Sequence, residues 1–207
     1  MAIKVIICLV LGYIFGCFQT GYFYGKLFKG IDVRNYGSGN AGTTNTLRTL
    51  GKPAGYIVFL GDALKAVFAV WIVRYLLFPG LGDVTKILET VTALGVVLGH
   101  NYPFYMHFKG GKGIAATFGC FLGLLPHWIP LCVLASIFIF FSCVVKINPN
   151  YYRTVATYIL AAICTVWLEP NRYIVFGFLL IAASVLAKLF MSAEEKEHFE
   201  VKLAWKH

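Results

Sequence analysis

Charged residues are scarce in this chain. Only 13% of its 207 residues are Asp, Glu, Lys or Arg, whereas 59% are hydrophobic. Soluble domains carry about 25% charged residues, so the composition excludes an ordinary water-soluble protein. Long apolar stretches with few charges are typical of helices that cross a membrane. The sequence therefore predicts an all-α integral membrane protein.

Cysteine patterns for metal or redox sites are also missing. The cysteines all lie within apolar runs, and the sequence has no C-x-x-C pair and no Cys/His cluster with the spacing of metal ligands. We expect free thiols that pack as small apolar side chains, with no metal and no cofactor. The six cysteines are Cys8, Cys17, Cys120, Cys132, Cys143 and Cys164.

Acidic residues are few compared with basic ones. The chain has 18 Lys and Arg against 9 Asp and Glu, a formal charge of +9. In a soluble protein this excess would suggest nucleic acid as a partner. In a membrane protein, an excess of basic residues instead indicates which loops lie in the cytosol. We adopt the second interpretation and expect a lipid bilayer, and no nucleic acid, as the partner.

Seven apolar segments are candidate transmembrane helices, since a helix needs about 20 residues to cross a bilayer. Segments 87–98 and 114–125 are shorter, and we expect one or both to be half-helices or re-entrant segments that line a polar cavity. The first segment lacks a small-x-small cleavage pattern, which favours a retained helix over a removed signal peptide. The seven segments are 3–24, 54–78, 87–98, 114–125, 128–145, 154–168 and 173–190.

Loop charges predict the orientation of these helices. The odd-numbered loops contain one acidic residue, Asp32, among many basic ones, whereas the even loops mix both signs. By the positive-inside rule, the odd loops and the C-terminus are cytosolic and the N-terminus is outside. Since no linker or repeat divides the chain, we expect a single domain, 1–207. The basic residues of the odd loops are Lys26, Lys29, Arg34, Arg48, Lys52, Lys109, Lys112, Lys146 and Arg153.

The first predicted loop contains the sequence NYGSGNAGTTN, residues 35–45. Glycines permit positive φ, so backbone N–H groups can converge on an anion, while hydroxyl, amide and guanidinium side chains add donors. A flexible turn is the alternative, but the interleaved polar side chains favour an anion site. The G-x-G-x-x-G spacing is weak evidence for a nucleotide fold, because no strand precedes it. The glycines are Gly37, Gly39 and Gly42, and the donors are Ser38, Asn40, Thr43, Thr44, Asn45 and Arg48.

The third predicted loop is GHNYPFYMHFKGGKGIAA, residues 99–116. Two cations, Lys109 and Lys112, surround glycines at the start of an apolar segment, where helix N-terminal amides would also attract an anion. It is not a Walker A loop, because Gly113 rather than Ser or Thr follows Lys112. The alternative is that the lysines are interfacial residues. For Lys109 the two interpretations carry equal weight.

Three other ionisable residues are notable. We expect His100 to cap a helix end or orient the loop, with a catalytic base as the less favoured alternative. Asp62 and Lys65 lie three residues apart on one helix face and can neutralise each other, as ionised residues inside a membrane almost require. We expect a structural pair, with support of the glycine-rich loop as the alternative role.

Two anion sites on one cytosolic face of an apolar helical body suit a reaction of lipid synthesis. The chain of an acyl phosphate can lie along the helices, and its phosphate is already a good leaving group, so no covalent enzyme nucleophile is required. The protein would hold two phosphates, orient an alcohol toward the carbonyl carbon and stabilise developing negative charge.

These loops resemble the motifs of a known family, the bacterial membrane acyltransferases that use acyl phosphate to acylate the first hydroxyl of glycerol 3-phosphate. GSGNAGTTN with Arg48 is similar to the family's first motif, GHNYPFYMHFKGGKGIA to its second, and LGDALK to its second helix. The resemblance covers the chain to about residue 125. It implies seven transmembrane helices, lysophosphatidic acid as product, no metal, and an active site on the cytosolic face of the bacterial cell membrane.

The resemblance also implies residue roles. Catalytic residues would be Ser38, Asn40 and Arg48, which polarise the acyl phosphate, and Lys112, which neutralises phosphate charge, while the substrate's own phosphate would act as the base. Thr154 or Thr157 would replace a serine of the family's third motif. The substrate-binding residues would be Gly37, Gly39, Gly42, Thr44, Asn45, His100, Lys109, Gly110, Gly111, Gly113 and Thr154.

The C-terminal region departs from the family. An Arg-His-x-x-Asn-like segment that helps to bind glycerol 3-phosphate is replaced by AKLFMSAEEKEHFEVK, in which Lys188 or His198 would have to substitute. From Ser192 onward, a capping-box pattern with Glu195 and apolar anchors (Phe199, Leu203 and Trp205) predict an amphipathic surface helix. Binding of the soluble enzyme that makes acyl phosphate is the alternative role of this tail.

Other functions remain open. Thioester-dependent glycerol-phosphate acyltransferases place Asp five residues after a His, and none of the five histidines here has that partner. A non-catalytic or retuned relative would bind acyl phosphate or phospholipid without the family's turnover. A transporter of a phosphorylated solute ranks last, because transporter sites lie near the bilayer midplane between repeats, whereas these polar residues gather at one face.

Overall fold

The computed structural model describes residues 1–192 and 199–203. In this part of the chain, short 3-10 turns cover Val33–Asn35 and Phe104–Met106, and two short strands are β1 (Val145–Asn148) and β2 (Glu200–Leu203). The α-helices are α1 (Ala2–Cys17), α2 (Thr20–Lys29), α3 (Thr43–Leu50), α4 (Lys52–Trp71), α5 (Asp83–Asn101), α6 (Ile114–Gly123), α7 (Ile129–Ile139), α8 (Asn150–Leu168) and α9 (Arg172–Phe190).

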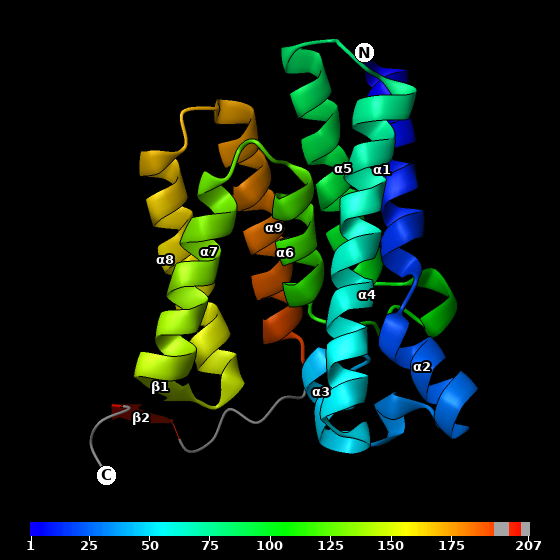
Figure 1. Cartoon of the computed structure of the whole chain (residues 1–207), viewed down its shortest axis with the longest axis vertical. Coiled ribbons are helices and arrows are strands. Elements are labelled where there is room, and N and C mark those ends of the chain that lie inside the picture. The colour runs from blue at the N-terminus through cyan, green and yellow to red at the C-terminus, as the bar shows by residue number, and fades with distance from the viewer. Residues whose placement is uncertain (193–198, 204–207) are drawn as a thin grey trace.

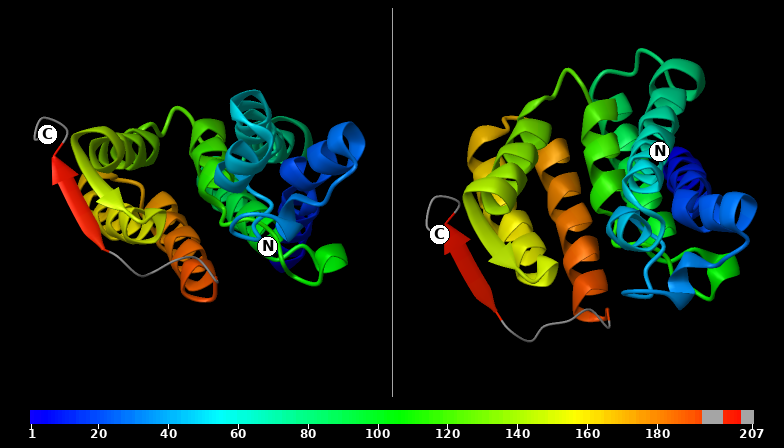
Figure 2. Two further views of the ribbon diagram at one scale, coloured as in Figure 1. Left: turned by 90° about the horizontal axis from the view of Figure 1, so that it is seen from below. Right: turned by 60° about the horizontal axis from the view of Figure 1, so that its bottom comes forward.

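The long helices stand side by side, and the short helices α2 and α3 and the two strands lie together at one end (Figure 1). Seen from that end, α1, α4 and α5 form one group and α7 and α8 another, with α6 and α9 between them (Figure 2). Helix α6 joins the groups, since it packs on α4 and α5 on one side and on α7 on the other. The end with α2 and α3 also carries both glycine-rich loops.

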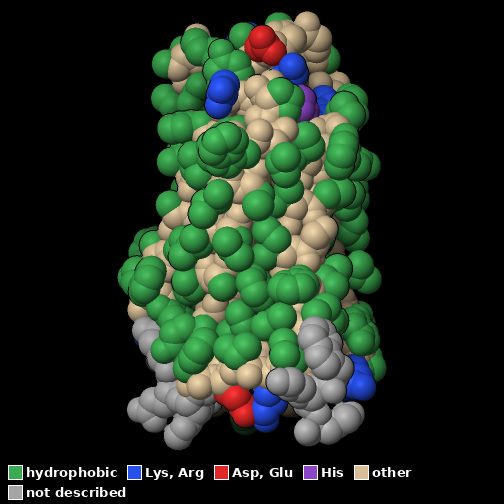
Figure 3. Space-filling view, turned by 90° about the vertical axis from the view of Figure 1, so that its left-hand side faces the viewer, with side chains coloured by type: hydrophobic (Ala, Val, Ile, Leu, Met, Phe, Trp, Pro, Cys, Tyr) green, Lys and Arg blue, Asp and Glu red, His purple; other side chains and the backbone are tan. Residues whose placement is uncertain are grey.

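The surface between the two ends is apolar. On the face shown in Figure 3, hydrophobic side chains cover the middle of the molecule, and the charged side chains gather at its two ends. Three segments of the described chain are long and apolar enough to cross a membrane, namely 2–29, 52–77 and 172–190. This distribution is that of a body embedded in lipid, with polar groups at the interfaces.

Helices α1 and α5 pack through glycines at very short range. A Cβ added at Gly12 would lie 2.2 Å from the carbonyl oxygen of Thr92, and one added at Gly99 would lie 2.1 Å from that of Tyr13. Small residues spaced in this way let two backbones approach, as is usual between helices in membranes. The close packing places the end of α5, with His100, against the end of α1.

The predicted first span, 3–24, lies within the membrane-length segment 2–29, but it is not a single helix, because α1 ends at Cys17 and α2 begins at Thr20. The break exposes backbone carbonyl groups that a membrane protein cannot leave unpaired. Lys65 Nζ donates to the oxygens of Gly16 and Phe18, and Gln19 Nε2 donates to Gly16. The buried Lys65 thus stabilises a helix break that apolar periodicity does not reveal.

Segment 87–98 was predicted to be short, and this prediction is wrong, since α5 has 19 residues. Two acidic residues lower its apparent hydropathy without breaking it: Asp83 lies at the exposed start, and Glu89 is buried against Arg74. Segment 114–125 does form a short helix, α6, of 10 residues. The segments 54–78, 128–145, 154–168 and 173–190 correspond to α4, α7, α8 and α9, although α4 and α7 end in π-helical turns and α8 begins four residues earlier than predicted.

The C-terminal tail differs from its prediction. Residues Glu200–Leu203 form strand β2, which pairs antiparallel with β1 (Val145–Asn148) instead of continuing an amphipathic helix. Sequence periodicity could not anticipate this pairing, because the partner strand lies more than 50 residues earlier in the chain. The predicted capping partner Glu195, the anchor Trp205 and the candidate His198 lie outside the described residues.

Candidate active site

A cavity of about 280 Å³ lies where the two glycine-rich loops meet. Residues at the starts of three helices line it: Thr43 of α3, Ile114 of α6 and Asn150 of α8. The first N–H groups of a helix lack partners within the helix and carry partial positive charge. Three helix starts around one cavity therefore favour an anion.

Asn45 organises the first glycine-rich loop. It is 1% exposed, and its Nδ2 donates to the carbonyl oxygens of Val33, Tyr36 and Asn40 at 2.8, 3.0 and 2.9 Å. Its Oδ1 accepts the Ser38 N–H at 2.8 Å. The loop backbone thus engages both ends of the amide. Asn45 holds Ser38 and Asn40 at the cavity wall.

Gly37 has to be glycine. Its φ is +56°, and a Cβ would lie 2.3 Å from Asn45 Oδ1. Asn40 adds a local turn, because its Oδ1 accepts the Gly42 N–H at 2.8 Å, directly before α3 begins. The loop is therefore a folded support for α3 and differs from the flexible turn that was the alternative.

The second glycine-rich loop crosses the end of α5. The N–H groups of Gly110 and Gly111 donate to the carbonyl oxygens of Asn101 and His100, at 3.3 and 2.9 Å. A Cβ on Gly111 would lie 1.9 Å from His100 Nε2. These N–H groups are engaged by α5 and do not point into the cavity, so both glycines serve close packing.

Lys112 and Gly113 are the residues of this loop that line the cavity. Gly113 precedes α6 with φ of +81°, a conformation that favours glycine and lets the chain turn from Lys112 into the helix. Arg153, on the first turn of α8, is a second cation in the lining, and its Nη2 donates to Asn150 Oδ1 at 2.7 Å. Lys112 and Arg153 thus belong to different elements of the wall.

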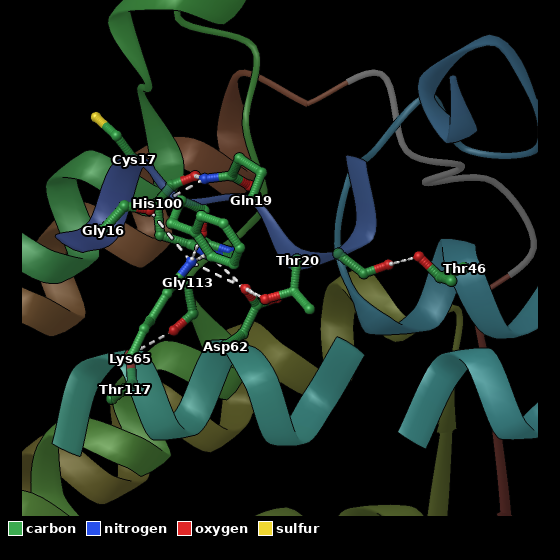
Figure 4. A network of polar contacts seen from close by, with 12 residues as sticks. Gly16, Cys17, Gln19, Thr20, Thr46, Asp62, Lys65, His100, Gly113 and Thr117 are labelled. Atoms are coloured by element: carbon green, nitrogen blue, oxygen red, sulfur yellow. Dashed lines mark hydrogen bonds and ion pairs between the residues drawn. The ribbon is translucent and has the colours of Figure 1, made fainter. Parts of the chain in front are cut away.

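A buried polar network adjoins the cavity (Figure 4). Lys65 Nζ lies 2.9 Å from Asp62 Oδ1 and 2.9 Å from His100 Nδ1, and Thr20 donates to Asp62 Oδ1 at 3.0 Å. An ammonium group only donates, so His100 Nδ1 accepts and the ring proton resides on Nε2. Gln19 Nε2 donates to the His100 carbonyl oxygen at 2.9 Å. The expected pairing of Asp62 with Lys65 is therefore present, and Asp62 and His100 line the cavity as well.

One wall of the cavity is aromatic. It contains Phe59 of α4, Phe118 of α6 and Phe138 of α7. The ring centroids of Phe59 and Phe118 lie 6.5 Å apart, and those of Phe118 and Phe138 lie 5.9 Å apart. The cavity thus combines a cationic polar side with an apolar side built from three helices that also face the lipid.

The two glycine-rich loops also contact each other outside the cavity, through Arg34. Arg34 Nη2 lies 2.7 Å from Asp32 Oδ2, and Arg34 Nη1 donates to the carbonyl oxygen of Met106 at 3.3 Å. The hydrogen bonds from Arg34 hold the pKa of Asp32 below its usual value. The ion pair holds the Arg34 side chain in place, and the hydrogen bond of that side chain to Met106 joins the first loop to the second.

The cavity brings together nine of the residues predicted to be catalytic or substrate-binding. Four of them belong to the first loop and the start of α3, as the sequence predicted: Ser38, Asn40, Gly42 and Thr44. The Thr154 hydroxyl donates to the carbonyl oxygen of Asn150 at 2.8 Å, so the helix engages its proton. The nine are Ser38, Asn40, Gly42, Thr44, Asn45, His100, Lys112, Gly113 and Thr154.

The other predicted residues lie beside the cavity and do not line it. Arg48 and Lys109 are exposed to solvent. Gly37 and Gly39 shape the first loop with positive φ, and Gly110 and Gly111 pack on α5. The predicted residues outside the cavity lining are Gly37, Gly39, Arg48, Lys109, Gly110 and Gly111.

Sequence reasoning gave no site role to several lining residues. The sequence marks Arg153 only by its charge, and it marks Asp62 as half of a structural pair, with support of the glycine-rich loop as the alternative. The aromatic residues carry no local signal, because apolar residues are everywhere in such helices. Within residues 1–192 and 199–203, no group of three His, Cys, Asp or Glu side chains could hold a metal ion. The additional lining residues include Phe59, Asp62, Phe118, Phe138, Asn150 and Arg153, whereas Thr43, which also lines the cavity, was predicted as an anion donor.

Comparison with known proteins identifies relatives over most of the chain. The family model for glycerol-3-phosphate acyltransferase matches residues 6–196. The glycerol-3-phosphate acyltransferase of Staphylococcus haemolyticus (strain JCSC1435) is 38% identical over 186 residues, which cover 88% of each chain. That of Staphylococcus aureus (strain Newman) is 33% identical over 210 residues, covering 97% of this chain and 98% of the relative.

Solved structures are similar too. The crystal structure of PlsY, an integral membrane glycerol 3-phosphate acyltransferase, in its glycerol 3-phosphate form matches with a TM-score of 0.73 and 28% identity over 89% of this chain and 87% of that chain. The lysophosphatidic acid form matches with a TM-score of 0.69 and 27% identity. These findings confirm the resemblance seen in the two loop motifs and confirm an all-α, multi-pass integral membrane protein. The chain belongs to the glycerol-3-phosphate acyltransferase family.

Proposed function

We propose that the protein transfers a fatty acyl group from acyl phosphate to the 1-hydroxyl of glycerol 3-phosphate, giving lysophosphatidic acid and inorganic phosphate. The observation that carries this proposal is the convergence of three helix starts and two cations, Lys112 and Arg153, on one cavity with an aromatic wall. Such a cavity suits two phosphate groups and one apolar chain. The relatives described above are named glycerol-3-phosphate acyltransferases, which supports glycerol 3-phosphate as the acceptor.

The starts of α3 and α6 form the proposed acyl-phosphate site. Ser38, Thr43 and Thr44 supply hydroxyl groups there, and Lys112 supplies charge. The Thr43 Oγ1 atom is buried without a hydrogen-bond partner among the described residues, so it is free to donate to a phosphate oxygen. Backbone amides, hydroxyls and a lysine together form a strong phosphate site.

The start of α8 forms the proposed site for the phosphate of glycerol 3-phosphate. Asn150 and Arg153 lie on its first turn, and a guanidinium group suits a phosphate through paired hydrogen bonds. In this assignment, Arg153 of α8 binds the phosphate of the acceptor in place of the Arg-His-x-x-Asn-like segment that the chain lacks after α9. It gives each of the two phosphates its own helix start and its own cation.

The acyl chain would lie along Phe59, Phe118 and Phe138, which continue from the polar side of the cavity toward the lipid-facing helices. In the reaction, the acceptor hydroxyl oxygen attacks the carbonyl carbon, and the bond from that carbon to the phosphate oxygen breaks. Negative charge grows on the leaving phosphate. The helix starts and Lys112 are preorganised to stabilise it.

Arg48 and Lys109 take a different role in this proposal. Both are exposed and outside the cavity lining, so the proposal assigns Arg48 no catalytic role. Their charges would attract the two anionic substrates to the end of the molecule where the loops meet. Asn45, Gly110 and Gly111 become supporting residues, since their polar groups bond to the backbone around them.

We further propose the predicted topology: one domain, 1–207, with seven membrane spans, an outer N-terminus and a cytosolic active site in the bacterial cell membrane. The supporting observation is that α2, α3 and the glycine-rich loops, which hold most of the basic loop residues, lie at one end of the helices (Figure 1). The positive-inside rule assigns that end to the cytosol.

The test uses purified protein with palmitoyl phosphate and glycerol 3-phosphate, and follows lysophosphatidic acid and released phosphate over time. We expect equal amounts of both products, and a large loss in Ser38→Ala, which removes a hydroxyl at the cavity wall. Palmitoyl thioester supplied as the only donor is the control and should give no product. Binding of palmitoyl phosphate without turnover would instead indicate a retuned relative, and activity with the thioester alone would refute the proposal.

A further inference from the structure

A second hollow lies on α1 and α5, which stand side by side (Figure 1). Its volume is about 350 Å³, and its lining shares no residue with that of the active-site cavity. The lining side chains come from α1, from the end of α5 and from the second glycine-rich loop, and all are apolar or aromatic. We call this hollow the α1–α5 groove, and its residues are Leu9, Val10, Tyr13, Leu98, Tyr102 and Phe108.

A cation lies at the edge of this groove. Lys188 is in the last turn of α9, and its Nζ is 4.5 Å from the centroid of the Tyr102 ring and donates to the carbonyl oxygen of Phe108 at 3.2 Å. An ammonium group has three donors, and the contact with Phe108 uses one of them. Within residues 1–192 and 199–203, Lys188 forms no ion pair. The groove thus combines an apolar wall with a charge that no acidic side chain in this part of the chain neutralises.

Lys188 does not take part in the active-site cavity. The sequence suggested it as a substitute for the missing acceptor-binding segment, but it is not a lining residue of the cavity. Its ammonium group lies instead against Tyr102 and Phe108, both of which line the groove. Its charge is therefore placed to serve a ligand of the groove.

Phe108 has a backbone conformation that bulky residues rarely adopt. Its φ is +58°, and that of the preceding His107 is +54°. The N–H of Phe108 donates to the carbonyl oxygen of Pro103 at 3.1 Å, and its own carbonyl oxygen accepts from Lys188, so both backbone groups are fixed. The ring is nevertheless 58% exposed in the groove wall. Backbone strain of this kind is typical of residues that contact a ligand.

The position of the groove determines what can occupy it. Helices α1 and α9 belong to segments that are long and apolar enough to cross a membrane. Lysine and tyrosine near helix ends are typical of the interface between lipid and water. An occupant therefore needs an apolar chain for the groove and an anionic group for Lys188. A phospholipid with a net negative headgroup has both, whereas a zwitterionic lipid brings a positive group beside its phosphate and gains less from the lysine.

We infer that the α1–α5 groove binds an anionic phospholipid of the surrounding bilayer. The lipid phosphate contacts the ammonium group of Lys188, and an acyl chain lies along the groove against Leu9 and Tyr13. The second glycine-rich loop borders the groove at Phe108 and the cavity at Lys112, so a lipid bound here packs against the loop that carries Lys112. The site is separate from the active site and does not depend on the proposed reaction.

The test compares two lipids at one introduced tryptophan, Leu9→Trp, in the groove. The protein is reconstituted in vesicles of equal parts phosphatidylcholine and phosphatidylglycerol, and one lipid or the other has brominated acyl chains, which quench tryptophan fluorescence on contact. The matched control is Ile159→Trp on α8, because Leu9 and Ile159 are 37% and 47% exposed and Ile159 does not line the groove. In all variants the native tryptophans are changed to Phe: Trp71, Trp128, Trp167 and Trp205.

We expect phosphatidylglycerol to be preferred about 5-fold at Leu9→Trp, the factor that one lysine contributes beside an anionic lipid, and to show no preference at Ile159→Trp. Lys188→Met should remove the preference at Leu9→Trp, and Lys188→Arg, which keeps the charge, should retain it. Equal quenching by both lipids at Leu9→Trp, a preference that persists in Lys188→Met, or the same preference at Ile159→Trp would overturn the inference. Formation of lysophosphatidic acid is not part of the measurement, so such a result would leave the proposed function untouched.

Discussion

Asn45 provides a sharp test of how the first glycine-rich loop is built. The sequence suggested that this side chain binds acyl phosphate, whereas the structure places its amide within the loop. Nδ2 faces three carbonyl oxygens at 2.8 to 3.0 Å, and Oδ1 accepts the Ser38 N–H at 2.8 Å. The two hydrogens of Nδ2 and the one accepted by Oδ1 amount to three hydrogen bonds in a site that is 1% exposed.

Two substitutions at this position separate support of the loop from ligand binding. Asn45→Ala removes about three hydrogen bonds, each with a net contribution of about 1 kcal/mol, so the free energy of unfolding should fall by about 3 kcal/mol. Asn45→Asp has nearly the same shape and keeps the acceptor for the Ser38 N–H. It turns an oxygen toward the carbonyl groups of Val33, Tyr36 and Asn40, however, and places a negative charge against three carbonyl oxygens in a buried site.

We therefore expect Asn45→Asp to destabilise the protein at least as much as Asn45→Ala, although it is the smaller change. For a chain of this size, about 3 kcal/mol corresponds to a decrease in Tm of about 6–12 °C. The assay is thermal unfolding of purified protein in detergent, together with binding of palmitoyl phosphate. A Tm equal to that of the wild type in Asn45→Asp, with loss of binding only, would refute the reasoning and would make Asn45 a ligand.

Four further predictions concern the cavity and the loops. Lys112→Met should lower kcat/KM by about 10²-fold because it removes charge stabilisation of the leaving phosphate, whereas Lys109→Met, outside the lining, should change it little; steady-state kinetics of both variants decides this. Arg153→Met should raise KM for glycerol 3-phosphate by about 10-fold or more and leave binding of palmitoyl phosphate unchanged; equal effects on both substrates would contradict separate phosphate sites. Phe118→Ala should favour bulkier or longer acyl chains and Phe118→Trp shorter ones, as measured by kcat/KM for a series of acyl phosphates; a shift of both variants in one direction would exclude Phe118 from the acyl site. Because Arg34 lowers the pKa of Asp32, this carboxylate stabilises the fold above its unfolded pKa and the contribution is lost as the pH falls through the folded pKa. The difference in Tm between wild type and Asp32→Asn should thus be present at pH 7 and should decrease progressively as the pH falls below about 4; a difference that grew in acid would have the wrong sign.

The loops could be recognised from the sequence because their chemistry is local. Glycines interleaved with Asn, Thr and Ser predict a backbone that bends around an anion, and a lysine before an apolar run predicts a helix start that attracts one. The apolar segments were equally visible, since a membrane helix is defined by its composition. These local signals identified both sides of one cavity.

Roles that depend on distant contacts could not be predicted. Gly110 and Gly111 look like parts of an anion nest, and only the end of α5 shows that its carbonyl groups engage their N–H groups. The break between α1 and α2 depends on Lys65, more than 40 residues later. Arg153 lines the cavity because α8 begins beside α3 and α6, which no pattern within α8 reveals. In each case the decisive partner belongs to another helix.

The central claim is that the two glycine-rich loops enclose one binding site for the head of an acyl phosphate. The measurement uses variants with one introduced cysteine each, Thr44→Cys at the start of α3 or Ile114→Cys at the start of α6. In both variants the accessible native cysteines Cys132, Cys143 and Cys164 are changed to Ala. The rate of modification by a water-soluble thiol reagent is measured at increasing palmitoyl phosphate, without glycerol 3-phosphate. We expect palmitoyl phosphate to protect both cysteines with the same half-saturating concentration, and to leave a cysteine at the exposed position of Lys109 unprotected. Protection of only one of the two positions, or protection at clearly different concentrations, would contradict a shared site.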